Sequence, residues 1–191
     1  MLNAQYQFKL REAGCDEVGR GCIAGPVVAA AVILPPEYKN KFIIDSKKIS
    51  QKKRKELGQE IIDNAISWSI SEVSNNKIDE INILNASILA MHRALDKLKV
   101  RPEFIIVDGN KFRPYNKISH ECIIKGDNKF QNIAAASILA KNYRDDLMKK
   151  LSIKYNKYSW ESNFGYPTKK HRDSIKKNGT TKYHRKSFKL L

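Results

Sequence analysis

The sequence has few cysteines, no long apolar segment and a shortage of acidic residues. Three cysteines occur in 191 residues. Their number is odd, and they lack the CxxC spacing of a zinc site. We interpret all three as buried thiols of a cytosolic protein. The longest apolar run, 24–34, contains glycine and proline and is far shorter than the roughly 20 residues that cross a membrane. We therefore expect a soluble, cytoplasmic protein without a signal peptide or membrane contact.

Several familiar sequence signatures are also missing. There is no GxxxxGK[ST] loop, which argues against a nucleoside triphosphatase, and no GxSxG elbow. The four histidines have no obvious nucleophile as a partner. No repeat or Pro/Ser-rich linker divides the chain. We therefore expect one domain over 1–191, with its core at about 10–188.

The charge is strongly basic, with 36 Lys and Arg against 20 Asp and Glu and a formal net charge of +16. Such an excess indicates a polyanionic partner. Segment 41–55 holds seven basic residues against Asp45, and 168–191 holds nine against Asp173. Biased codon usage could produce the composition, but this clustering argues against that explanation.

The pattern of apolar residues predicts alternating strands and helices. We expect strands at 12–18, 27–34, 66–73, 103–109 and 121–127. Continuous apolarity in the fourth and fifth indicates strands covered on both faces, whereas 66–73 alternates Ile66, Trp68 and Ile70 with serines.

We expect four helices as well. The first begins at the N-cap Ser50 and ends near Asn64, and the second carries an apolar seam from Leu84 to Leu98. The third covers 129–151, with an apolar stripe ending in Tyr143, Leu147 and Leu151 and with Lys141 and Arg144 on its outer side. The fourth begins at Thr168 and ends at Gly179.

Acidic residues recur where predicted strands end. They are Asp16 and Glu17, Asp108, and Asp127. In open α/β sheets the ligand site lies off the carboxyl ends of the strands, so these acids can converge on one edge. One such acid is usually a turn or cap residue, but four in the same context favour a site. Carboxylates without a His/Cys cluster select Mg²⁺ or Mn²⁺ over zinc, and a polyanionic partner then indicates two-metal phosphodiester hydrolysis.

Two further segments have features of a nucleic-acid site. Gly19 and Gly21 bracket Arg20, which favours a loop that offers backbone N–H and C=O groups to a sugar or phosphate, although such residues also form ordinary turns. Tyr166, in a Gly-Tyr-Pro turn, is either a stacking platform for a nucleotide or an aromatic that packs at the domain edge.

Seven motifs in order resemble bacterial ribonuclease HII across nearly the whole chain. They are DEVGRG at 16–21, DSKK at 45–48, VDGN at 107–110, KGD at 125–127, AASILAK at 135–141, GYPT at 165–168 and HRKSF at 184–188. The resemblance implies the α/β ribonuclease H-like fold, a five-stranded mixed sheet flanked by helices, with a C-terminal helical segment. It also implies hydrolysis of RNA in RNA·DNA hybrids and incision at single ribonucleotides in duplex DNA, leaving 3′-hydroxyl and 5′-phosphate ends.

The resemblance also implies roles for particular residues. The metal-binding acids, for two Mn²⁺ or Mg²⁺ ions, fall on Asp16, Glu17, Asp108 and Asp127. The ribose-sensing loop falls on Gly19, Arg20 and Gly21, the junction-sensing tyrosine on Tyr166, and the phosphate grip on Ser46, Lys47 and Lys48. Cys22 stands where the family often has proline, and the chain ends soon after Phe188, which makes a tail-borne partner motif doubtful. We expect a monomer.

Two other functions are compatible with parts of the sequence. A non-enzymatic nucleic-acid-binding protein would account for the charge but has no use for four converging acids, which repel phosphates without metal. A Mg²⁺-dependent phosphatase of small substrates would prefer a DxD-like nucleophile and leaves the basic clusters unexplained.

Overall fold

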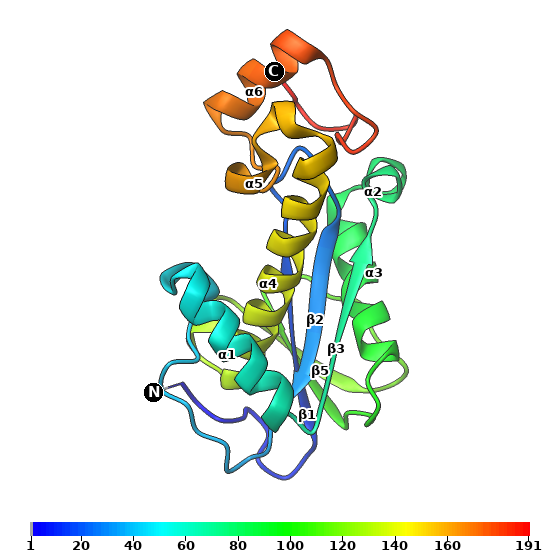
Figure 1. Ribbon diagram of the computed structural model, residues 1–191. Coiled ribbons are helices and arrows are strands. Elements are labelled where there is room, and N and C mark those ends of the chain that lie inside the picture. Colours follow the sequence, from blue (N-terminus) through cyan, green and yellow to red (C-terminus); the bar gives the residue numbers. More distant parts are fainter. Residues whose placement is uncertain (1) are drawn as a thin grey trace.

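A computed structural model describes residues 2–191, apart from the side chain of Lys47 (Figure 1). Its centre is a five-stranded sheet in the order β3-β2-β1-β4-β5. The strands are β1 Glu12–Val18, β2 Val27–Ile33, β3 Ser67–Val73, β4 Phe104–Asp108 and β5 Ser119–Ile123. β1, β4 and β5 are mutually parallel, while β2 is antiparallel to both β1 and β3. The expected mixed sheet is confirmed.

Helices cover both faces of this sheet (Figure 1). They are α1 Gln51–Asn64, α2 Asn75–Ile81, α3 Ile83–Asp96, α4 Gln131–Lys154, α5 Trp160–Asn163 and α6 Lys169–Asn178. Short 3₁₀ turns are η1 Ser46–Lys48, η2 Gly126–Asn128 and η3 Asn156–Tyr158. The α1 and α4 helices lie on one face and α3 on the other, with α5 and α6 beyond the C-terminal end of α4 (Figure 1).

The alternation of side chains along β2 creates two apolar cores. Val28, Ala30 and Val32 pack with α1 and α4, whereas the residues between them pack with α3. The N-terminal part of α4 lies directly on β1, because a Cβ atom at Gly14 would come within 2.2 Å of the Asn132 backbone. Gly14 thus sets the distance between β1 and α4.

Helix caps account for several boundaries. The side chains of Ser50 and Thr168 accept hydrogen bonds from the third residues of α1 and α6, as their positions predict. The α2 and α5 helices were not predicted, although Ser74 caps α2 in the same way. Both are short, so neither carries an apolar repeat long enough to identify it.

β3 buries its serine face and leaves much of its apolar face exposed. Ser67, Ser69 and Ser71 are buried, whereas Trp68 is 37% exposed. The Ser69 hydroxyl donates to the carbonyl of Ala94 in α3, and Ser67 accepts from the backbone N–H of Lys99. Side chains this small let α3 pack closely on the sheet, and these hydrogen bonds offset the cost of burying their hydroxyls.

The C-terminal half of α4 differs from its predicted apolar stripe. Tyr143 is exposed and Leu147 and Leu151 are only half-buried, while Arg144 is completely buried. The expectation that Arg144 lies on the outer side is therefore wrong. Its guanidinium donates to three backbone carbonyls, and these hydrogen bonds offset the free-energy cost of burying its charge.

The last strand also departs from expectation. β5 is an edge strand with its first residues largely exposed, so only β4 fits the prediction of a strand covered on both faces. β5 ends at Ile123, and Asp127 lies in η2 beyond it. Asp127 is therefore a turn residue after the sheet edge and does not end a strand.

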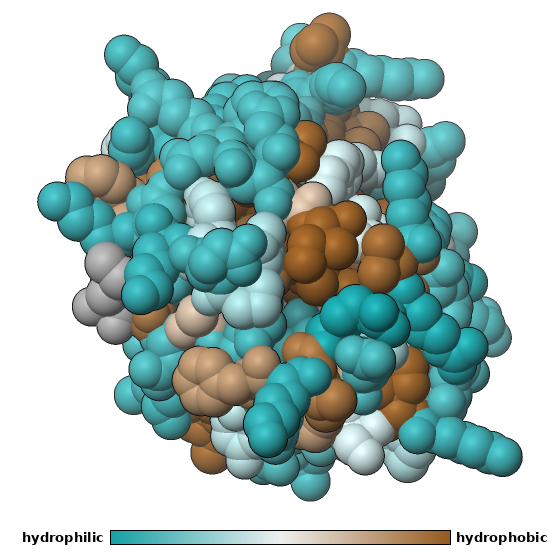
Figure 2. All heavy atoms as spheres, turned by 90° about the horizontal axis from the view of Figure 1, so that it is seen from below, coloured by the Kyte–Doolittle hydropathy of each residue, from teal (hydrophilic) through white to brown (hydrophobic). Residues whose placement is uncertain are grey.

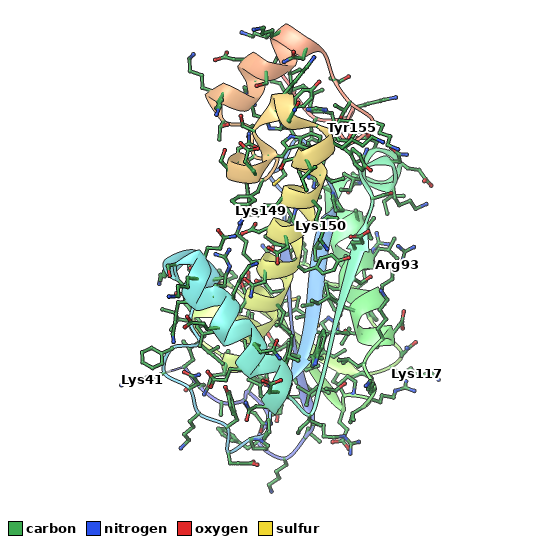
Figure 3. The ribbon with its side chains drawn as sticks, in the orientation of Figure 1. Lys41, Arg93, Lys117, Lys149, Lys150 and Tyr155 are labelled. Atoms are coloured by element: carbon green, nitrogen blue, oxygen red, sulfur yellow. The ribbon has the colours of Figure 1, made fainter. Side chains whose placement is uncertain are left out.

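Hydrophilic side chains cover most of the face that Figure 2 shows, and apolar ones form a few small groups. Basic side chains project in several directions: Lys41 and Lys117 from the two sides of the lower end, and Lys149 and Lys150 from α4 (Figure 3). Within residues 2–191, no helix combines the length and apolar character needed to cross a membrane.

Candidate active site

The carboxyl ends of β1 and β4 form one wall of a cavity. The parallel register pairs Cys15 with Val107, so Asp16 and Asp108 follow at neighbouring points of the two strands. The cavity has a volume of about 250 Å³. Its lining comprises Asp16, Glu17, Val18, Gly19, Arg20, Gly21, Ser46, Asp108, Ser137, Lys141 and Tyr166.

Asp16 is held from several sides. It shares the α4-facing side of β1 with Gly14, and the close packing permitted there brings Ser137 of α4 against it. Ser137 forms a hydrogen bond with the Asp16 carboxylate, and the Ser46 hydroxyl lies 2.9 Å from that of Ser137. The backbone N–H of Glu17 donates to Asp16 Oδ1 at 2.7 Å. The carboxylate is therefore fixed in orientation and buried.

Glu17 faces the loop that follows β1. Its Oε1 forms an ion pair with Arg20 Nη1 at 3.0 Å. The arginine is half exposed and the glutamate nearly buried, so the pair lies at the mouth of the cavity. Gly19 has φ of +93°, which turns the chain after β1, and residues 19–21 line the same cavity as Asp16 and Glu17.

Asp108 connects the end of β4 to the η2 turn. Its Oδ1 accepts a hydrogen bond of 2.7 Å from the backbone N–H of Gly126. Asp127 is the next residue, and its side chain is buried and accepts from the Asn128 amide at 2.8 Å. Asp127 does not line the cavity, so the structure gathers three of the four predicted acids there and places the fourth beside it.

The carboxylates oppose one another's ionisation. Burial, followed by the charges of Glu17 and Asp108, raises the pKa of Asp16 well above its usual range. Burial also raises the pKa of Glu17, with Asp108 adding to the effect and Arg20 opposing it. A site that holds like charges together in this way is suited to bind a cation.

The predicted phosphate grip is only partly in the cavity. Ser46 lines it, through η1. The side chain of Lys47 lies outside the described part of the structure. Lys48 is exposed, and its Nζ donates to Asn128 Oδ1 at 2.6 Å, next to Asp127.

Tyr166 closes the cavity from the C-terminal segment. Lys141 Nζ lies 5.8 Å from its ring centroid, and Arg144 lies 6.0 Å away. Burial raises the pKa of the Tyr166 hydroxyl to about 12, so it stays neutral at physiological pH. The turn is tied to the glycine loop because Gly165 accepts a hydrogen bond of 2.9 Å from the N–H of Ile23.

Two polar cavity residues, Ser137 and Lys141, were not predicted as site residues. They are four positions apart on α4 and therefore share one face of it, within the motif 135–141. Lys141 had been expected on the outer side of the helix. It forms an ion pair with Asp145 at 2.6 Å and is mostly buried. The i, i+4 spacing of two polar residues in a small-residue segment was the available signal.

The donor set of the cavity fits a hard divalent cation. Its candidate ligands are carboxylate and hydroxyl oxygens, and neither histidine nor cysteine lines it. Throughout the part of the chain that the structure describes, no group of three or more His, Cys, Asp or Glu side chains is arranged to hold an ion by itself. Mg²⁺ retains several waters and takes only one or two carboxylates directly, so the arrangement is adequate for it.

Comparison with known proteins identifies the family. The family model described as ribonuclease HII matches residues 13–191. The chain belongs to the ribonuclease HII family. It is 62% identical over 191 residues to ribonuclease HII of Christiangramia forsetii, covering 100% of this chain and 96% of that protein. Identity to the Parabacteroides distasonis ribonuclease HII is 58% over 180 residues, covering 94% of this chain and 90% of the relative.

Solved structures agree with this assignment. The ribonuclease H2 of Pyrococcus horikoshii superposes with a TM-score of 0.80 at 25% identity, covering 94% of each chain. A chain in the PCNA:RNase HII complex of Archaeoglobus fulgidus gives 0.80 at 27% identity and covers 95% of this chain and 96% of its own. The ribonuclease H-like fold is thus confirmed.

Family membership also defines the activity class. The chain is a metal-dependent hydrolase, an endoribonuclease that acts on the RNA strand of RNA·DNA hybrids. This result decides against both the non-enzymatic binding protein and the phosphatase.

Proposed function

We propose that Asp16, Glu17 and Asp108, assisted by Asp127, hold two Mg²⁺ or Mn²⁺ ions, and that the enzyme cleaves at single ribonucleotides in duplex DNA as well as in longer hybrids. The observation that carries this proposal is the meeting of three carboxylates beside an open glycine loop in one cavity. Their mutual repulsion supports a bound cation, since a cation removes it.

The protein's own groups would orient the reacting atoms. Bound cations would supply activation of the attacking water and stabilisation of charge on the leaving oxygen. Ser137 and the N–H of Glu17 keep the Asp16 carboxylate in one orientation, and the N–H of Gly126 does the same for Asp108. Lys141 at the cavity wall adds positive charge for the phosphate. The products would carry 3′-hydroxyl and 5′-phosphate ends.

Recognition of the ribose would come from the loop 19–21. A 2′-hydroxyl both donates and accepts a hydrogen bond, so a reader needs an acceptor and a donor together. Backbone groups of this loop provide both, and Gly21 is exposed with open space beside it. A nucleotide can therefore approach the backbone closely.

Tyr166 would read the next sugar. Its ring closes the same cavity as the loop, so the two elements can contact neighbouring nucleotides. A flat ring fits against a deoxyribose, where no 2′-hydroxyl projects. The site would then require RNA on one side of the cut and favour DNA on the other.

We further propose that one chain is sufficient for activity, because every group named above belongs to a single chain. Its substrates are hybrids and ribonucleotide-containing DNA, so we place its action in the cytoplasm.

The test uses end-labelled duplexes with Mg²⁺, Mn²⁺ or EDTA. One duplex contains a single ribonucleotide, the second is a long hybrid and the third is all DNA. We expect metal-dependent cleavage of the first two, with a 3′-hydroxyl that a polymerase extends. Cleavage of the all-DNA duplex, or failure to cut the single ribonucleotide, would contradict the proposal.

A further inference from the structure

A fully buried arginine from the C-terminal segment holds the loop that follows β1. Arg185 donates to three carbonyls of this loop: Nη2 to Gly19 at 2.7 Å, Nη1 to Arg20 at 2.9 Å and Nε to Gly25 at 3.0 Å. Its side chain is 0% exposed, and within residues 2–191 no carboxylate lies close enough to form an ion pair with it. The guanidinium is thus committed to the loop backbone.

These hydrogen bonds determine where the neighbouring N–H groups point. In a trans peptide the C=O of one residue and the N–H of the next lie in one plane and point in opposite directions. Carbonyls of Gly19 and Arg20 that face the buried guanidinium therefore turn the N–H groups of Arg20 and Gly21 away from it. Both residues line the cavity, and neither N–H donates to another group in the described structure.

The same arrangement leaves one acceptor. Of the three carbonyls in 19–21, the first two accept from Arg185 and only that of Gly21 has no donor within the described residues. The loop consequently offers two donors and one acceptor, a set that matches a sugar hydroxyl.

We propose that Arg185 is a positioning residue for ribose recognition: it orients the peptide groups of 19–21 so that the N–H groups of Arg20 and Gly21 and the carbonyl of Gly21 meet the 2′-hydroxyl. This inference rests on the proposed function of the loop. Only a planar guanidinium presents several donors in a fixed fork, so lysine cannot replace it.

The first test measures, without added metal, the affinity of the protein for two duplexes. One contains a single ribonucleotide and the other is all DNA. In Arg185→Lys we expect the affinity ratio between them to fall about tenfold towards one, while affinity for the all-DNA duplex stays within about twofold. Under single turnover at saturating enzyme concentration, the cleavage rate at the single ribonucleotide should also fall at least about tenfold.

Arg54→Lys is the matched control. Arg54 is also buried and donates to Asn142 and Asp145, joining α1 to α4 away from the loop. It should lower Tm but keep the affinity ratio. If Arg185→Lys lowers Tm and likewise keeps the ratio, Arg185 is merely structural and the proposal is wrong.

A measurement on the wild type does not depend on the variant folding. The ¹⁵N–¹H signals of Arg20 and Gly21 should shift with the ribonucleotide-containing duplex and much less with the all-DNA duplex. Equal shifts would overturn the proposal. A wild-type enzyme that does not cut the single ribonucleotide would instead refute the proposed function, so the two failures are distinguishable.

Discussion

Asp16 is a buried carboxylate beside two other acids, and this arrangement destabilises the metal-free protein. Its pKa in the folded state lies above the unfolded value, so the folded state binds the proton more tightly. The penalty is therefore complete above the folded-state pKa and is lost as the pH falls from that pKa to the unfolded value.

Replacing Asp16 by Asn removes one of the repelling charges. We expect the free energy of unfolding to rise by about 1–2 kcal/mol, which would raise Tm by roughly 3–6 °C at pH 7 for a chain of this size. We expect this gain without metal, and we expect it to shrink at lower pH. Thermal unfolding at several pH values in EDTA measures it.

Mn²⁺ provides the control for this prediction. It should stabilise the wild type, by about 2.7 kcal/mol at a concentration of 100 Kd, and stabilise Asp16→Asn much less. A variant less stable than the wild type in EDTA would show that repulsion at Asp16 is unimportant.

Substitution of Tyr166 should affect cleavage and affinity differently. Tyr166→Ala should lower cleavage at a single embedded ribonucleotide by about tenfold or more and lower affinity only slightly, because the ring orients the junction and basic residues supply most of the binding. Tyr166→Phe keeps the ring and should retain most activity. Wild-type cleavage by Tyr166→Ala would return the residue to an edge-packing role.

At the scale of elements, a chain of hydrogen bonds supports the Tyr166 turn. The N–H of Thr181 donates to His184 Nδ1, so the proton of that ring is on Nε2, which lies 3.2 Å from His171 Nε2. The His171 Nδ1–H then donates to the carbonyl of Tyr166 at 2.9 Å. Trp160 also donates to His171. Both histidines must be neutral for this network to form.

The network predicts an acid-sensitive C-terminal segment. Burial lowers the pKa of His171, and burial together with His171 lowers that of His184 from 6.5 to about 4. Their contribution to stability is full above pH 6.5 and is lost as the pH falls towards 4, because only the unfolded state readily takes up the proton.

Tryptophan fluorescence can detect this loss. In a Trp68→Phe background the remaining Trp160 reports on the segment directly. Its emission should shift to the red between pH 6.5 and 4, before circular dichroism records loss of the sheet. Unchanged emission down to pH 4 would contradict the role of the histidines.

Regular elements were predictable where one periodicity dominates. The apolar run of β4, the seam of α3 and the caps of α1 and α6 all depend on local residues. In β3 the alternation was visible, but the identity of its buried face depends on α3, which needs small neighbours there. The outward prediction for Arg144 failed because its partners are backbone carbonyls, which carry no sequence signal.

The site residues likewise divide into those that local sequence predicts and those that depend on contacts distant in the sequence. Asp16 and Asp108 were predictable because parallel strands bring their carboxyl ends to one edge. Ser137 and Lys141 were missed because their inclusion depends on how α4 lies across β1. The role of Arg185 depends on a contact 166 residues apart in sequence.

At the scale of the whole molecule, a net charge of +16 should make duplex binding strongly dependent on salt. Each phosphate contact contributes a slope of about −0.9 to a plot of log affinity against log salt. Lys47→Ala should therefore make the slope shallower by about one. Lys117→Ala is the control. Lys117 lies in a turn on the opposite side of the view from Lys41, which belongs to the basic segment 41–55 (Figure 3). Equal slopes and affinities for wild type and Lys47→Ala would show that Lys47 contacts no phosphate.

We propose that carboxylates from β1 and β4 act together in metal-dependent cleavage. The most direct test is single-turnover cleavage of a one-ribonucleotide duplex by wild type and Asp108→Asn across a Mn²⁺ series, with duplex affinity measured in parallel. We predict a rate at least about a thousandfold lower at every Mn²⁺ concentration, with affinity preserved, since several kcal/mol of charge stabilisation are lost. Cleavage by Asp108→Asn at the wild-type rate would contradict the account.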